Sequence, residues 1–193
     1  MWVRGMPAWE IVGLPDVSIK ESKERVRTAI KNSGLEFPSR RIVVNLAPAD
    51  SRKEGPLFDL PIAIGILIAT EVIGHSNINN YAFIGELSLD GRINKVQGIL
   101  PMCIEARRLG IEKIIIPEEN VCEASVVNGI DIMPAKTLTD VMAHLNLVKS
   151  LEKVNASSKE LFNKSKKYKF NFSDVRGQEN IKRALEISAA GRT

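Results

Sequence analysis

The segment Leu60–Thr70 is the most apolar stretch of the chain, and it constrains the fold more than any other feature. It is too short to cross a bilayer, which needs about 20 apolar residues, and Pro61 interrupts it near its start. Proline fits the first turn of a helix, where its missing N–H costs nothing. We therefore expect a helix from about Leu60 to Ile73, with Asp59 as its N-cap, at the centre of a core.

Short β-branched segments alternate with helical segments on both sides of this helix. We expect strands at Trp9–Leu14, Arg41–Leu46, Tyr81–Ser88, Arg92–Val96, Lys113–Ile116 and Ile130–Met133. We expect helices from Asp16 or Ser18 to Asn32, at Gly98–Leu109, over 118–127 and at Thr137–Leu145. Asp90-Gly91 predicts a hairpin between the third and fourth strands. This alternation indicates a single α/β domain over residues 1–146.

The positive charge of the chain is concentrated outside that domain. Residues 1–146 carry 16 Lys and Arg against 18 Asp and Glu, whereas residues 147–172 carry seven Lys against two Glu. We interpret residues 147–172 as a Lys-rich linker and residues 173–193 as a further segment with a helix over Gln178–Ala190. The pI of about 9.1 therefore gives no reason to expect nucleic-acid binding by the core.

Composition excludes several classes of site. Cys103 and Cys122 lie 19 positions apart without a second pair, so they predict buried reduced thiols rather than a zinc or redox site. His75 and His144 lie in unrelated segments, so we expect no metal site. No signal peptide and no membrane span are apparent, and we expect a cytoplasmic protein with no membrane partner.

Several longer motifs resemble one family. They are Val12-Gly13-Leu14-Pro15-Asp16, Asn45-Leu46-Ala47-Pro48-Ala49-Asp50, Arg52-Lys53-Glu54-Gly55-Pro56, Gly85-Glu86-Leu87-Ser88-Leu89-Asp90-Gly91 and Asp174-Val175-Arg176-Gly177-Gln178-Glu179. Together they resemble the Mg chelatase-like AAA+ ATPases of the ComM/YifB type. The resemblance implies a ribosomal protein S5 domain 2-like fold, which the Lon protease domain shares. It also implies a hexameric parent ATPase that acts in DNA branch migration, with DNA and neighbouring subunits as partners.

The resemblance further implies that residues 173–193 open the ATPase module of that parent. Gly177 and Gln178 would then lie on the adenine side of a nucleotide, but only with the rest of the module present. ATP and Mg are the expected cofactors of the full-length parent. No GxxxxGK[ST] motif occurs in this sequence, and the family's phosphate-binding loop would begin just after Thr193. An early strand would precede Trp9. We expect no ATP hydrolysis by this chain alone.

The likeness to Lon raises the alternative of a Ser–Lys peptidase. In Lon-type domains the serine follows a Gly-Pro pair, and the lysine lies in a Gly-Gly-Leu-Lys segment. Here Gly55-Pro56 precedes Leu57, and Gln97-Gly98-Ile99 precedes Leu100. An alkyl side chain can neither attack a carbonyl nor accept a proton, so we expect no catalytic residues at these positions. Another kind of hydrolase would need a different polar cleft.

Basic residues leave a nucleic-acid alternative open. Lys20, Lys23, Arg27 and Lys31 share one face of the first helix, with Arg40 and Arg41 after it, while Arg52 and Lys53 lie in a charged loop with Asp50 and Asp59. These residues would either neutralise DNA phosphates or remain a solvated face and an internally paired loop. The same choice applies to five linker lysines, Lys159, Lys164, Lys166, Lys167 and Lys169. A stand-alone nucleic-acid-binding module is thus a further alternative.

Overall fold

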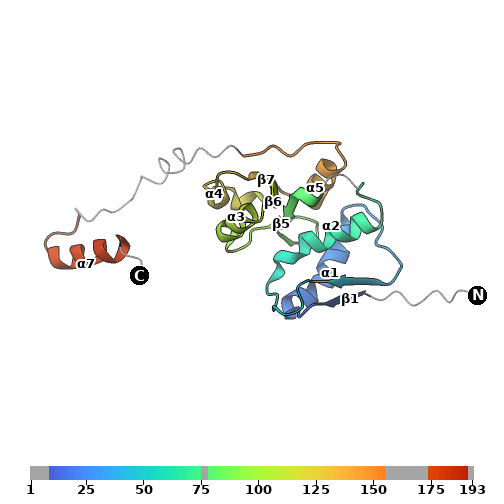
Figure 1. Ribbon diagram of the computed structural model, residues 1–193, viewed down its shortest axis with the longest axis horizontal. Helices are drawn as coiled ribbons and strands as arrows, with labels where there is room; N and C mark the ends of the chain where they lie inside the picture. The colour runs from blue at the N-terminus through green and yellow to red at the C-terminus, as the bar shows by residue number, and fades with distance from the viewer. Residues whose placement is uncertain (1–8, 75–77, 155–173, 191–193) are drawn as a thin grey trace, which may run out of the picture. The chain divides into compact units, whose positions relative to one another are not determined.

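The computed structural model describes residues 9–74, 78–154 and 174–190. The chain divides into two compact units, and the boundary lies between Ala156 and Ser157. The first unit contains β1 (Trp9–Val12), α1 (Val17–Asn32), β2 (Ile42–Asn45), η1 (Pro56–Phe58), α2 (Asp59–Ala69), η2 (Ile78–Asn80), β3 (Tyr81–Phe83), β4 (Glu86–Leu87), β5 (Ile93–Asn94), α3 (Ile99–Arg108), β6 (Lys113–Pro117), η3 (Glu118–Asn120), α4 (Val121–Ala124), β7 (Asp131–Ala135) and α5 (Leu138–Leu145) (Figure 1). The second unit contains α7 (Glu179–Ala190). The predicted alternation of strands and helices is confirmed.

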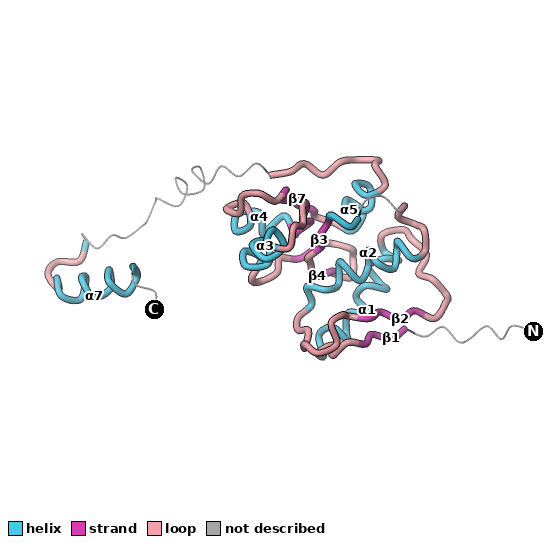
Figure 2. Tube along the Cα trace, viewed as in Figure 1, coloured by secondary structure: helices cyan, strands magenta, loops and turns pink. Residues whose placement is uncertain are grey.

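The strands of the described residues form three small sheets (Figure 2). β1 and β2 are parallel, β3, β6 and β7 form a parallel sheet with β6 in the middle, and β4 pairs antiparallel with β5. β6 is a continuous apolar run in which Ile114, Ile115 and Ile116 are fully buried. Such runs are typical of the middle strand of a parallel sheet, because both faces of that strand are covered.

α2 is the predicted central helix, and most of its residues are buried. It ends earlier than expected, because Glu71 has a positive φ of 60° that an α-helix cannot continue through. The prediction that Asp59 is its N-cap is wrong. Phe58 holds that position, and Asp59 is the first helical residue, with its buried carboxylate bonded to Arg25. The early turn η1 removes the need for a side-chain cap.

The predicted strand Tyr81–Ser88 is two strands, β3 and β4, separated at Gly85. Gly85 bonds to the turn before α2 instead of a strand: its N–H donates to the Leu57 carbonyl at 3.1 Å, and its carbonyl accepts from the Leu60 N–H at 3.0 Å. A Cβ at this glycine would lie 2.5 Å from a methyl carbon of Ile93. The close packing therefore requires glycine here. The hairpin at Asp90-Gly91 is confirmed.

Two apolar clusters form the core of the first unit. We call the first the α2 cluster, because most buried residues of α2 belong to it together with residues of α1 and α5. We call the second the α3 cluster; its buried members are Ile84, Val96, Ile99, Cys103, Ala106, Ile114, Ile116, Ala124, Val127, Ile130 and Ile132. Ile114 and Ile116 of β6 join the α3 cluster, whereas Ile115 between them joins the α2 cluster. The two clusters thus lie on opposite faces of β6.

The first unit extends beyond Asn146, where the predicted linker begins. The Val154 N–H donates to the Ile132 carbonyl at 2.9 Å, and Lys153 lies 3.3 Å from Asp131. Leu151 packs against the α2 cluster. The segment 151–154 therefore lies along β7. The five lysines predicted as a solvated linker lie outside the described residues.

Candidate functional site

The turn that leads into α2 is held by Asp16. One carboxylate oxygen of Asp16 caps α1 by accepting from the Ile19 N–H at 2.8 Å, and the other accepts from the Gly55 N–H at 3.0 Å. Burial by itself would raise the pKa of Asp16. The two backbone N–H groups and the nearby Arg52 together outweigh this effect, so the pKa lies below its usual value. Of the two predicted N-caps, Asp16 and Ser18, the structure shows Asp16, which also fixes the Gly55-Pro56 turn. Sequence patterns gave no indication of this second contact.

Leu57 and Leu100 pack against the same apolar cluster. Leu57 lies in η1 and Leu100 in the first turn of α3, and both half-buried side chains pack against the α3 cluster. The Leu100 N–H donates to the Glu123 carboxylate at 3.2 Å, which fixes the start of α3. Hydrocarbon therefore occupies both positions at which the resemblance to Lon implies the serine and the lysine, and both side chains pack against one apolar cluster.

The described ranges contain no other arrangement typical of a nucleophile or a metal site. Within them, no serine or threonine hydroxyl is hydrogen-bonded to a lysine ammonium, and no group of three His, Cys, Asp or Glu side chains could hold a metal ion. Cys103 is buried, and burial raises the pKa of its thiol to about 11, with a smaller contribution from Glu123. Cys122 is exposed, so the prediction that both thiols are buried is wrong for this residue.

Arg25 and Asp59 form a buried ion pair between α1 and α2. The Asp59 carboxylate is fully buried and accepts from Arg25 Nε at 2.7 Å, from Arg25 Nη2 at 3.1 Å and from the Leu87 N–H at 3.1 Å. Arg25 Nη2 also donates to the Ser18 carbonyl and the Ser22 hydroxyl. Hydrogen bonding to Asp59 raises the pKa of the Arg25 guanidinium above its usual value. This pair is part of the framework, because neither charge faces solvent freely.

The basic face of α1 is present in the structure. Lys20, Arg27 and Lys31 are exposed and Lys23 is half-buried, and none of the four forms an ion pair with a described residue. Arg27 lies over the Phe37 ring at 5.6 Å from its centroid, which orients its guanidinium. These four residues, which we call the α1 basic face, therefore present their charge to solvent.

The two loop residues predicted with them differ from one another. Arg52 is exposed and pairs with Glu54 at 3.3 Å. Lys53 is buried, and its ammonium donates to the carbonyls of Pro48 and Ser51. Lys53 thus organises its own loop and does not present its charge to a partner. This outcome matches the alternative in which the loop is internally paired.

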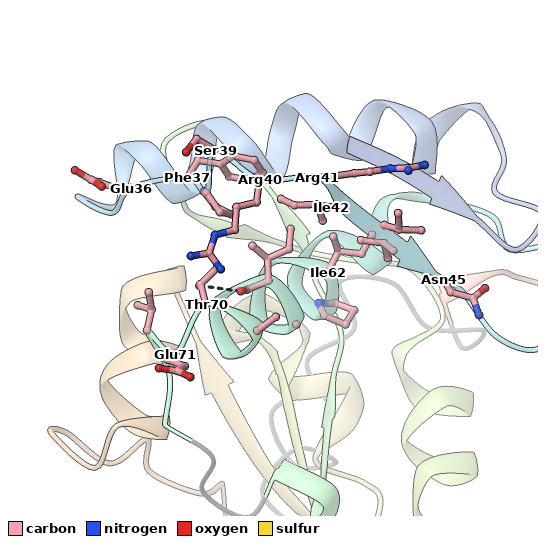
Figure 3. Close-up of a pocket in the computed structure, with 18 of the residues that line it drawn as sticks. Glu36, Phe37, Ser39, Arg40, Arg41, Ile42, Asn45, Ile62, Thr70 and Glu71 are labelled. Atoms are coloured by element: carbon pink, nitrogen blue, oxygen red, sulfur yellow. Dashed lines mark hydrogen bonds between the residues drawn. The ribbon is translucent and has the colours of Figure 1, made fainter. Parts of the chain in front are cut away.

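A groove of about 1090 Å³ lies between β2 and α2 (Figure 3). Glu36, Arg40, Thr70 and Glu71 lie toward one end of it, whereas Arg41 and Asn45 lie toward the other (Figure 3). The Thr70 hydroxyl donates to the Ile66 carbonyl at 2.9 Å, so it is committed to the end of α2. Neither Leu57 nor Leu100 lines the groove, although Phe58, the neighbour of Leu57, does.

His144 links α5 to the segment that leaves the domain. The Leu151 N–H donates to His144 Nδ1 at 3.1 Å, so the neutral ring carries its proton on Nε2, which lies 3.1 Å from the Tyr81 hydroxyl. The Lys113 ammonium donates to the same hydroxyl at 3.3 Å. Burial, and secondarily the Lys113 charge, lowers the pKa of His144. The other histidine, His75, lies outside the described residues.

Protonation of His144 is expected to destabilise the first unit. The unfolded chain binds a proton at this residue near pH 6.5, whereas the folded chain resists it, so stability should be full above about pH 6.5 and fall as the pH drops toward the lowered pKa. Chemical denaturation at pH 7.5 and pH 5.5 measures this loss, because most carboxylates stay ionised in that range. A His144→Gln variant should show a flatter dependence. An equally steep dependence in that variant would show that other groups cause it.

Gly177 and Gln178 lie in the second unit. Both have positive φ, and the Gln178 carbonyl accepts from the N–H groups of Ile181 and Lys182 at 3.0 Å each, which starts α7. Their expected position beside adenine stays a prediction.

Within the described ranges, no helix combines the length and the hydropathy that a membrane span requires.

Comparison with known proteins places these features in context. A family model described as subunit ChlI of Mg-chelatase matches residues 1–120. The chain is 42% identical over 189 residues to the competence protein ComM of Haemophilus influenzae, a match that covers 97% of this chain and 37% of ComM. It is 41% identical over 188 residues to YifB of Escherichia coli, with 97% and 36% covered. The chain thus spans little more than a third of the length of these relatives.

A more distant likeness concerns the fold. Lon protease 2 of Bacillus subtilis is 30% identical over 147 residues, which cover 72% of this chain and 26% of that protease. Together with the α/β architecture and its parallel sheets, this likeness confirms the predicted S5 domain 2-like, Lon protease-like fold. The resemblance to Mg chelatase-like proteins that the motifs predicted is also confirmed.

Proposed function

Because the chain belongs to the family of Mg-chelatase ChlI-like proteins that includes ComM and YifB, we propose that it is a non-catalytic accessory domain of a ring-forming AAA+ ATPase. The observation that carries this proposal is the packing of Leu57 and Leu100 into the α3 cluster. Hydrocarbon at both positions of the Lon dyad removes peptidase chemistry and leaves a scaffold for contacts. No observation favours a hydrolase.

In this proposal α7 and the residues before it open the ATPase module, and ATP and Mg bind only in the complete parent. The chain itself lacks the amides and lysine of a phosphate-binding loop, so it does not hydrolyse ATP. Steady ATP turnover by the purified chain, freed of contaminating ATPases, would contradict this part. The domain acts in the cytoplasm and contacts neighbouring subunits and DNA.

The α1 basic face is the DNA contact in this proposal. Its four cations form no ion pair with a described residue and are suited to backbone phosphates. Phosphate contacts carry no sequence information, which favours binding without sequence preference. Contact with about three phosphates would lower the affinity roughly 40-fold between 50 and 200 mM salt. Arg52 adds one exposed cation near the capped end of α1, because the backbone of its neighbour Lys53 bonds to Leu14 and Asp16. Lys53 itself is excluded by its burial.

Fluorescence anisotropy with labelled single-stranded and duplex DNA tests this contact on the full chain. A Lys20→Glu, Arg27→Glu, Lys31→Glu variant should lose most of the binding. A Lys95→Glu, Arg107→Glu, Lys136→Glu variant changes the net charge equally at exposed residues of other elements, and it should retain it. A third variant replaces the five linker lysines by glutamine. If only that variant loses DNA binding, the linker is the binding site. If the wild-type chain binds no DNA at 50 mM salt, only the role in assembly remains.

A further inference from the structure

The groove between β2 and α2 has the geometry of a binding site for an extended chain. All four residues of β2 line it and no residue of β1 does, so it lies on the side of β2 away from β1. Within the described residues, β2 pairs only with β1, and its second edge is open to the groove. An open strand edge offers unpaired backbone donors and acceptors to another polypeptide.

Backbone direction shows which groups face the groove. The Leu46 N–H donates to the Val12 carbonyl at 2.9 Å, so the backbone N–H and C=O groups of Leu46 point toward β1. These groups point to alternate sides from one residue of a strand to the next, so the N–H and C=O groups of Ile42 and Val44 also point toward β1. The N–H and C=O groups of Val43 and Asn45 therefore point into the groove. One added strand could form backbone hydrogen bonds to these two residues.

The floor of the groove is one apolar face of α2, formed by Pro61, Ile62, Gly65, Ile66 and Ala69. Gly65 lies in the middle of this helix, where glycine costs about 1 kcal/mol relative to alanine. No atom lies within 4 Å of the position that a Cβ would occupy there. Tight packing therefore does not explain this glycine. Its lack of a side chain leaves room for another backbone to approach.

A single unpaired cation lies at one end of the groove. Arg40 makes no hydrogen bond or ion pair with any described residue, whereas its neighbour Arg41 is 3.5 Å from Glu10. Figure 3 shows the Arg40 side chain reaching across this end toward Thr70, while Glu36 points away. Arg40 precedes β2, so it lies beside the C-terminal end of any strand added antiparallel to β2. Glu36 and Glu71 at the same end disfavour more than one acidic group.

From these features we propose that the groove binds an extended polypeptide segment antiparallel to β2. The segment bonds to the backbone of Val43 and Asn45, packs alternate apolar side chains on α2, and places one carboxylate at its C-terminal end beside Arg40. The lining of the groove includes neither Leu57 nor Leu100, and it meets the α1 basic face at Phe37, whose ring Arg27 covers. The groove would thus give the domain a protein partner in addition to DNA.

A fluorescein-labelled hexapeptide of alternating threonine and valine with a free C-terminal carboxylate is the probe. Anisotropy with the full chain should show saturable binding, and the amide protons of Val43 and Asn45 should gain protection from exchange. The same peptide with an amidated C-terminus should bind about fivefold more weakly, which corresponds to an exposed charge pair. Absence of binding, or equal affinity for the two peptides, would overturn the proposal.

Two variants separate this site from a loss of folding. A Cβ at Gly65 meets no atom within 4 Å, so Gly65→Leu should place a side chain in the groove and keep or raise thermal stability. It should weaken peptide binding more than tenfold. Arg40→Gln should abolish the preference for the carboxylate, and the matched control Arg41→Gln should not. If the peptide still binds Gly65→Leu at full strength, the site lies elsewhere. The wild-type chain could instead self-associate through the groove. Self-association that Gly65→Leu abolishes, and that the peptide does not inhibit, would assign the groove to a second copy of the chain.

Discussion

Replacing Asp59 with alanine is expected to lower the free energy of unfolding by about 3–5 kcal/mol, because it leaves the Arg25 guanidinium without its buried counter-charge. The carboxylate is fully buried and accepts three hydrogen bonds, so the Leu87 N–H also loses its partner. Urea denaturation of the wild type and the variant, at a pH well above the carboxylate range, measures the difference.

A double substitution tests whether the charge or the packing matters at this place. Arg25→Met combined with Asp59→Leu removes both charges and keeps apolar volume, so much of the stability should return. Asp90→Ala breaks an exposed pair with Arg92 that has the same separation of 2.7 Å, and it should change stability far less. A similar loss in Asp59→Ala and Asp90→Ala would contradict a special role for the buried pair.

Replacing Gly13 with alanine should cost about 2–4 kcal/mol, since it combines an unfavourable backbone with a clash. Gly13 has a φ of +102°, and a Cβ there would lie 2.8 Å from the carbonyl carbon of Leu46 and against its oxygen. The clash is with backbone, which cannot rotate away. Gly13 ends β1 where it runs beside the end of β2, so the variant should disturb this sheet. Thermal unfolding followed by circular dichroism detects the loss.

Gly34 provides the matched control for the backbone contribution. It has a φ of +80° after α1, and no atom lies within 4 Å of its Cβ position. Gly34→Ala should therefore cost only the left-handed conformation, about 1–2 kcal/mol. If the two variants lose equal stability, steric contact with Leu46 contributes nothing and the account of Gly13 fails.

Local patterns predicted most elements of the first unit. Asp16, one of the two expected starts of the first helix, caps α1, and the hairpin turns at Asp90-Gly91 as expected. The helix expected at Thr137–Leu145 is α5, which begins with a capping box of Thr137 and Asp140. These features depend on residues within a few positions of each other, so the sequence contains what is needed to predict them. Predictions failed where a distant segment competes for the same backbone. Gly85 interrupts an apparent strand because it bonds to the turn before α2.

The candidate sites divide in the same way. The amino-acid types at positions 57 and 100, and the spacing of cations on α1, can be seen in the sequence and define the chemistry available. Only the fold shows that Lys53 is buried while Lys20 is exposed, because burial depends on which carbonyls surround the ammonium. The open edge of β2 is likewise a property of pairing between strands, and no local pattern indicates it.

The sequence by itself determined the order of the elements, the apolar central helix and the absence of a hydroxyl and an amine at Leu57 and Leu100, because each follows from residue type and short-range spacing. The tertiary structure alone decided that Arg25 meets Asp59, 34 positions away, and that His144 accepts from the Leu151 N–H. It also decided that Arg40 lines a groove and has no ion pair with a described residue. These contacts depend on how whole helices and strands pack together, and packing is set by the entire core rather than by any one segment.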